Sequence, residues 1–106
     1  MSHQVLDRVN ADQDRRIAAT LRRDPRRLGA ARAALGRWMA ADGKRVRPVF
    51  REWHAVLRRL TVREIAAFLC SGTPMARRLR QSSPLAGILS DAERQAIRRR
   101  YEKTGA

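Results

Sequence analysis

The chain has 106 residues, of which 43% are apolar and only 5% aromatic, enough for one small domain with a thin core. The single cysteine, Cys70, excludes an internal disulfide, and no run approaches the roughly 20 apolar residues of a membrane span. The formal net charge of +14 favours contact with a polyanion or an acidic protein. We therefore expect a single cytoplasmic domain over residues 1–106, away from membranes and stabilised by a partner or as a homodimer. Residues 1–4 are expected to be disordered and 104–106 to form a tail.

Helical periodicity runs along the chain, and no segment alternates over a strand's length. A first helix is expected over residues 5–22, with Leu6, Val9, Gln13, Ile17 and Leu21 sharing its apolar face. Asp24 and Pro25 are typical of a helix start, the aspartate as N-cap and the proline at the first helical position. A second helix is therefore expected to run to about Ala41 and to end at Asp42 and Gly43.

The middle of the chain gives sharper boundaries. The segment GKRVRP, 43–48, predicts a flexible loop, and Pro48 opens a third helix that ends near Arg59. Thr61 and Glu64 have the spacing of a capping box, so a fourth helix follows directly and closes at Gly72.

The last third is also expected to be helical. A short helix over 74–81 should turn Met75 and Leu79 inward, and the segment 82–89 should form a connector with a helical turn. A final helix is expected over 91–103. The fold class is thus all-α, a compact bundle of five to six short helices.

The segment 61–82 is a candidate helix-turn-helix, with Ala66 in the first helix and Cys70 at the turn. Ser71 and Ala76 depart from the larger apolar residues usual at their positions, so a plain helical hairpin is the alternative. In a DNA-reading unit the second helix would offer bases or phosphates the side chains of Arg77, Arg78, Arg80 and Gln81.

Two further basic segments suit phosphate contacts, which need positive side chains but little geometry. The alternative for both is a solvated charged surface. The first segment surrounds the predicted loop and the second lies in the last helix; they comprise Lys44, Arg45, Arg47 and Arg51, and Arg98 and Arg99.

Catalysis has weaker support, and we expect no enzyme activity and no cofactor. Arg47 and His54 have an Arg-x6-His spacing similar to the pair in all-helical ribonucleases of the HEPN type. A small RNA-cleaving toxin is therefore an alternative function, although His54 follows Trp53 on a core helix and a structural imidazole is the favoured interpretation. His54 and Cys70 alone are too few ligands for a metal site.

Three stretches resemble a group of small bacterial helical proteins associated with toxin–antitoxin gene pairs: RIAATLRRDPRRLGAARAALGRW, REWHAVL and RRLRQSSPLAGILSDAERQAI. The resemblance covers about residues 13–101, and its most specific part is 78–90. It implies an antitoxin-like role, in which the protein is expected to bind a cognate toxin protein and also the DNA of its own operon.

The same region has a physical interpretation without the family. If the apolar turn after Pro84 anchors on the core, an exposed edge suited to phosphates or carboxylates would include Ser82 and Ser83 beside the arginines of 77–80. The function predicted from the sequence is therefore an antitoxin-like binding protein with an arginine-rich helical edge. A basic interaction module that binds no nucleic acid is the remaining alternative.

Overall fold

The computed structural model describes residues 3–102, and every regular element in this range is helical. The elements are α1 (His3–Arg23), η1 (Pro25–Arg27), α2 (Leu28–Asp42), α3 (Pro48–Arg59), α4 (Val62–Leu69), α5 (Pro74–Arg80), η2 (Ala86–Ile88) and α6 (Asp91–Glu102). The all-α class expected from the periodicity is confirmed.

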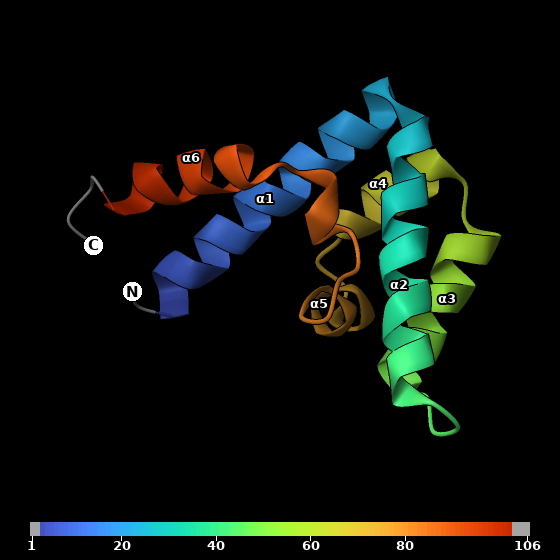
Figure 1. The fold of residues 1–106 in the computed structure, drawn as a ribbon. Helices are drawn as coiled ribbons and strands as arrows, with labels where there is room; N and C mark the ends of the chain where they lie inside the picture. Colours follow the sequence, from blue (N-terminus) through green and yellow to red (C-terminus); the bar gives the residue numbers. More distant parts are fainter. Residues whose placement is uncertain (1–2, 103–106) are drawn as a thin grey trace.

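The helices form two parts that meet at the core (Figure 1). The long helix α1 packs against α4 and α6, and α2 packs against α3 to form a helical hairpin. The tip of this hairpin points away from α1 and α6 (Figure 1). The short turn η2 contacts both α1 and α2, so the C-terminal connector joins the two parts.

Trp53 lies at the centre of the core and is fully buried. Its indole Nε1–H donates a 2.8 Å hydrogen bond to the carbonyl of Leu79, and its ring meets Phe68 edge to face at 5.7 Å. One side chain thus ties α3 to both α4 and α5. Because a domain of this size has few large aromatic side chains to bury, this anchor fixes how the hairpin sits on the rest of the fold.

Most element boundaries agree with those expected, and the disagreements have local causes. Helix α1 begins at His3, so the expected disorder of residues 3–4 is wrong; residues 1–2 and 103–106 lie outside the described range. Val5 is buried instead of Leu6, which is 41% exposed. Val5 and Val9 are four residues apart and share the buried face of α1, whereas Leu6 points outward.

Two expected end signals act differently in the structure. The Asp24 side chain makes no cap hydrogen bond and instead pairs with Arg26 and Arg27, so a 3-10 turn precedes α2. Helix α4 ends at Leu69, before Gly72. Met75, expected to point inward, is 47% exposed, because Ala76 and Leu79 fill the inner face of α5.

The predicted capping box at the start of α4 is confirmed. Thr61 Oγ1 accepts from the Glu64 N–H at 3.2 Å, and the Glu64 carboxylate accepts from the Thr61 N–H at 2.9 Å. Both bonds hold the pKa of Glu64 below its ordinary value. We expect Thr61→Ala to lower the free energy of unfolding by about 1 kcal/mol, measured by urea denaturation. Arg63→Ala, on the exposed side of the same turn, is the control. If Thr61→Ala lowers the free energy of unfolding no more than Arg63→Ala does, this role of the cap is contradicted.

Candidate functional site

The exposed face of α3 carries a line of basic side chains. Arg51, His54 and Arg58 are spaced by three and four residues, so they share one face of the helix. All three are exposed, and none of their side chains makes a hydrogen bond or ion pair with another described residue. We call these three residues the α3 stripe.

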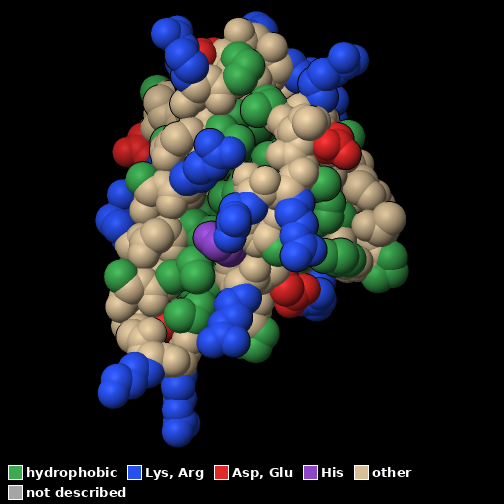
Figure 2. Space-filling model, turned by 90° about the vertical axis from the view of Figure 1, so that its right-hand side faces the viewer, with side chains coloured by type: hydrophobic (Ala, Val, Ile, Leu, Met, Phe, Trp, Pro, Cys, Tyr) green, Lys and Arg blue, Asp and Glu red, His purple; other side chains and the backbone are tan. Residues whose placement is uncertain are grey.

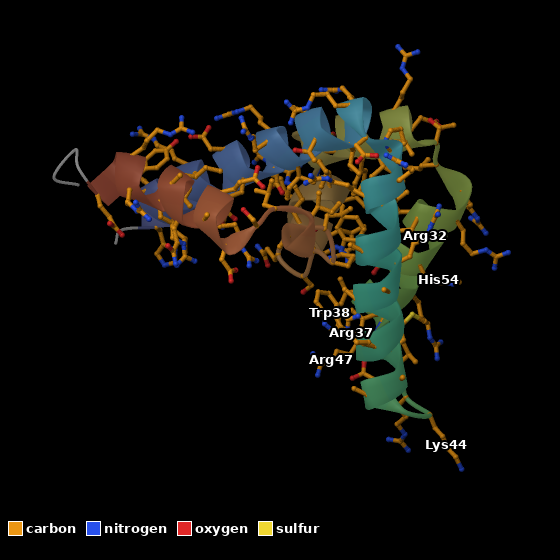
Figure 3. The ribbon with its side chains drawn as sticks, turned by 45° about the horizontal axis from the view of Figure 1, so that its top comes forward. Arg32, Arg37, Trp38, Lys44, Arg47 and His54 are labelled. Carbon is orange, nitrogen blue, oxygen red and sulfur yellow. The ribbon has the colours of Figure 1, made fainter. Side chains whose placement is uncertain are left out.

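Other basic groups extend this surface. Lys44 and Arg45 are exposed in the loop at the hairpin tip, and Arg32 of α2 reaches across to α3, where it donates to the carbonyl of Leu57 at 3.3 Å. Seen from the side of α2 and α3, lysine and arginine side chains gather around a histidine (Figure 2), and Arg32 and His54 lie on the same side of α2 (Figure 3). The hairpin therefore presents a broad positive face.

The acidic residues of the hairpin do not neutralise this face. Asp42 is held by the backbone N–H of Arg47 at 3.0 Å and pairs with its guanidinium at 3.4 Å. Glu52 forms a two-pronged pair with Arg78 at 2.6 and 3.0 Å, which holds the pKa of Glu52 below its ordinary value. Each carboxylate of residues 28–59 thus already has an arginine partner, and none of these partners belongs to the α3 stripe.

The arginines of α5, expected to form a free edge, are largely engaged inside the protein. Arg78 pairs with Glu52, and Arg80 donates to the carbonyls of Ser71 and Phe68 while lying 3.6 Å from the Asp14 carboxylate. This corrects the expected edge, because the positive ends of Arg78 and Arg80 hold α5 to α3, to α1 and to the turn after α4. Only Arg77 of this group is exposed without a partner among the described residues.

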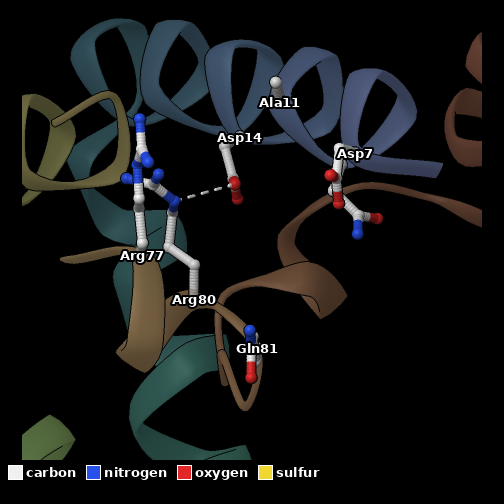
Figure 4. Close-up of a pocket in the computed structure, with 7 residues that line it drawn as sticks. Asp7, Ala11, Asp14, Arg77, Arg80 and Gln81 are labelled. Carbon is white, nitrogen blue, oxygen red and sulfur yellow. Dashed lines mark ion pairs between the residues drawn. The ribbon is translucent and has the colours of Figure 1, made fainter. Parts of the chain in front are cut away.

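Gln81 and Arg77 line a cleft between α1 and α5 with a volume of about 500 Å³ (Figure 4). Asp7 and Asp14 face them from α1, so the cleft carries both signs of charge. Burial raises the pKa of Asp14 to about 6, and Arg80 offsets only part of this rise. Because Arg80 directs its NH1 group at backbone carbonyls, it is a weak counter-charge for the carboxylate. A cleft of mixed charge is a poor match for a polyanion.

The two serines of the expected edge have separate roles. Ser83 Oγ accepts from the backbone N–H of Leu85 at 3.1 Å, which shapes the turn that buries Pro84 and Leu85. Ser82 instead lines a groove beside α2, together with Trp38. The RQSSP segment is therefore mainly a structural turn in this fold.

Arg47 and His54, the pair considered for RNA cleavage, do not converge. Arg47 pairs with Asp42 and covers the ring of Phe50 at 5.3 Å. Figure 3 shows Arg47 on the Trp38 side of α2 and His54 on the opposite side. The structure thus gives this pair no common site at which one phosphate could contact both groups.

Arg98 and Arg99 are exposed on α6, which lies beside α1 and away from the hairpin (Figure 1). They form a patch separate from the α3 stripe. The structure therefore divides the predicted basic residues into the hairpin, the engaged Arg78 and Arg80 of α5, the exposed Arg77 of the cleft, and the α6 patch.

The sequence did not lead us to Arg58, and we considered His54 as an acid–base group, a metal ligand or a structural imidazole, but not as part of a basic surface. Their spacing from Arg51 was a usable signal, because positions three, four and seven apart on a helix lie on one face. What the spacing could not show is that α3 packs on the rest of the fold through other side chains, among them the fully buried Trp53, so that this face remains open.

The chain is thus a small all-helical protein with a basic helical hairpin. Comparisons with known proteins found no matching family model, no matching curated protein and no matching solved structure. Among residues 3–102, no helix combines the length and apolar character that crossing a membrane requires. Within the same residues, no three histidine, cysteine or acidic side chains cluster as metal ligands.

Proposed function

We propose that this protein is an antitoxin-like regulator that binds nucleic acid through the basic face of the α2–α3 hairpin. The observation that carries the proposal is the α3 stripe, whose three basic side chains are exposed and have no acidic partner among the described residues. Carboxylates also pair with arginines elsewhere in the chain: Asp12 with Arg15, Asp91 with Arg94, and Glu93 with Arg16. The hairpin thus keeps exposed guanidinium groups that no described carboxylate neutralises.

Phosphate groups suit this surface better than an acidic protein does. Arg51 and Arg58 lie two helical turns apart, about 10 Å along the axis, and the loop residues Lys44 and Arg45 continue the charge beyond the helix end. Regularly spaced phosphates on a backbone match such a line of cations and release counterions on binding. Phosphate contacts supply affinity without base specificity, so we propose no particular sequence.

A matched pair of double variants tests the proposal. Arg51→Gln/Arg58→Gln removes two charges from the stripe, and Arg98→Gln/Arg99→Gln removes the same charge from exposed positions of α6. We expect the stripe variant to weaken binding to a labelled oligonucleotide about tenfold and to reduce the salt slope by about 2, measured by fluorescence anisotropy at several salt concentrations.

The α6 variant is the control for net charge, and we expect its affinity to stay close to that of the native protein. Equal losses in the two variants would show that only total charge matters and would contradict a site on α3. No binding by the native protein at low salt would contradict the nucleic-acid function altogether.

The toxin-binding half of the role rests on the resemblance alone. We propose that a cognate toxin, if its surface is acidic, meets the same basic hairpin, and that both act in the cytoplasm, where the unpaired Cys70 stays reduced. Co-purification of the two proteins, lost in the stripe variant and kept in the α6 variant, is the expected result. Co-purification unchanged in both variants would place the toxin elsewhere.

A further inference from the structure

A groove with an aromatic floor lies beside the basic hairpin. It has a volume of about 340 Å³ and is lined by Trp38, Ala41, Asp42, Arg47, Phe50 and Ser82; we call it the aromatic groove. The rings of Trp38 and Phe50 are 5.5 Å apart between centroids and tilted by 37°. Trp38 is half-buried, so part of its indole surface faces the groove.

The two tryptophans of the protein contrast sharply. Trp53 is fully buried and its indole N–H is bonded to Leu79. No hydrogen bond among the described residues engages the indole N–H of Trp38. Trp38 is thus a large aromatic side chain that contacts the core on one side and remains open on the other, although burying it fully would stabilise the fold more.

Arg47 lies at the edge of the groove. Its guanidinium is 5.3 Å from the centroid of the Phe50 ring and 3.4 Å from the Asp42 carboxylate, which also accepts from the Arg47 backbone N–H at 3.0 Å. A cation held in place before a ligand arrives loses little freedom on binding. Arg37 and Lys44 lie on neighbouring parts of the hairpin, with Arg37 on the same side of α2 as Trp38 and Lys44 at the tip (Figure 3).

We propose that the aromatic groove holds an unpaired nucleobase of a single-stranded nucleic acid. The base would stack on the open face of Trp38, with the Ser82 hydroxyl and the indole N–H at its edge. The adjoining phosphates would lie on Arg37, Arg47 and Lys44. Aromatic stacking combined with a positive track for the backbone is the general way in which proteins bind single strands.

The aromatic groove and the α3 stripe lie on the same hairpin, so one bound strand can contact both. His54 of the stripe and Trp38 of the groove lie on opposite sides of α2, and Lys44 lies at the tip of the hairpin (Figure 3). Arg45 follows Lys44 in the same exposed loop. A flexible single strand can follow a path around this tip, whereas a stiff duplex keeps its bases stacked inside. This inference rests on the proposed nucleic-acid function and narrows it to single strands.

Three ligands of equal length separate base binding from phosphate binding: a single-stranded oligonucleotide, an abasic strand that has the same phosphates, and a duplex. We expect the single strand, as RNA and as DNA, to quench tryptophan fluorescence and to bind about tenfold more tightly than the abasic strand, because stacking of one base contributes roughly 1–3 kcal/mol. The abasic strand and the duplex should leave the fluorescence unchanged.

Two variants locate the effect at Trp38. Trp38→Leu keeps an apolar side chain on the core but removes the stacking surface, so we expect it to lose the preference for the single strand and the quenching, with unchanged affinity for the abasic strand. Trp38→Phe keeps a ring and should retain most of the preference. The fully buried Trp53, which remains in both variants, reports whether the fold is intact.

The failures of the two proposals are distinguishable. Equal affinity of the native protein for the single and abasic strands, unaffected by Trp38→Leu, would overturn base binding and leave phosphate binding in place. No binding to any of the three ligands would overturn both. Tighter binding to the duplex than to the single strand would also overturn the base site, because it would place the phosphates of paired DNA on the hairpin.

Discussion

Replacing Trp53 by alanine is expected to lower the free energy of unfolding by about 3–5 kcal/mol, the largest single effect in this protein. Trp53 is fully buried, donates to the Leu79 carbonyl and contacts the edge of Phe68. The variant loses the apolar area, leaves a cavity and removes one of the two hydrogen bonds to the Leu79 carbonyl, which still accepts from the Ser82 N–H at 3.1 Å. Since small domains are stable by only about 5–15 kcal/mol, this loss is a large fraction of the total stability.

The variant Trp53→Phe separates packing from hydrogen bonding. Phenylalanine retains a ring against Phe68 but removes the indole donor, while the Leu79 carbonyl keeps its bond from the Ser82 N–H, so we expect a loss of about 1 kcal/mol. Urea denaturation followed by circular dichroism measures both values. If alanine costs no more than phenylalanine, the ring is not the anchor between α3 and the α4–α5 pair, and the position of the hairpin must depend on other contacts.

Replacing Asp14 by asparagine is expected to stabilise the protein at pH 7.5 by on the order of 2–3 kcal/mol. Burial between α1 and α5 raises the pKa of Asp14 to about 6, from an ordinary value of 3.8. Above pH 6 the folded protein keeps a buried carboxylate that the unfolded chain would expose to water. Asparagine removes this charge, and Arg80 retains the carbonyls of Ser71 and Phe68 as partners.

The sign of the pH dependence follows from the raised pKa. Between pH 3.8 and 6 the folded state binds the Asp14 proton more tightly than the unfolded state, so the native protein loses stability as pH rises through this range. The advantage of Asp14→Asn should therefore be full above pH 6 and vanish near pH 4. The other titrating groups are common to the variant and the native protein. Their contributions therefore cancel in the difference between the two free energies of unfolding.

Asp7→Asn provides the control, because Asp7 lines the same cleft but is exposed. We expect it to change the free energy of unfolding only slightly at either pH. If Asp14→Asn destabilises the protein at pH 7.5, the pair with Arg80 at 3.6 Å stabilises more than burial costs, and the cleft would be held by an ion pair.

Much of the fold could be predicted from local signals. The third helix begins at Pro48 and ends at Arg59 as expected, because proline fixes the first turn, and Thr61 and Glu64 start the next helix through two bonds within one turn. These signals need no distant partner. Asp24 failed as a cap because arginines two and three residues later compete for its carboxylate.

The candidate site was harder to predict, because the sequence shows which residues are charged but not which charges meet. Arg78 and Arg80 are separated from Glu52 and Asp14 by 26 and 66 residues, so no local pattern reveals those pairs. Arg51 and Arg58 are chemically the same, yet they remain unpaired on the open face of α3. The aromatic groove likewise joins α2, α3 and the turn after α5.

By itself the sequence determined that this protein is helical, where most helices begin, and that it carries a large positive charge, because periodicity, capping and composition are properties of neighbouring residues. Only the tertiary structure decided where that charge is available. Packing brings the acidic residues to particular arginines and covers some faces while leaving others open. For this reason exposed arginines without acidic partners lie on the α2–α3 hairpin, whereas Arg78 and Arg80 are engaged inside the fold.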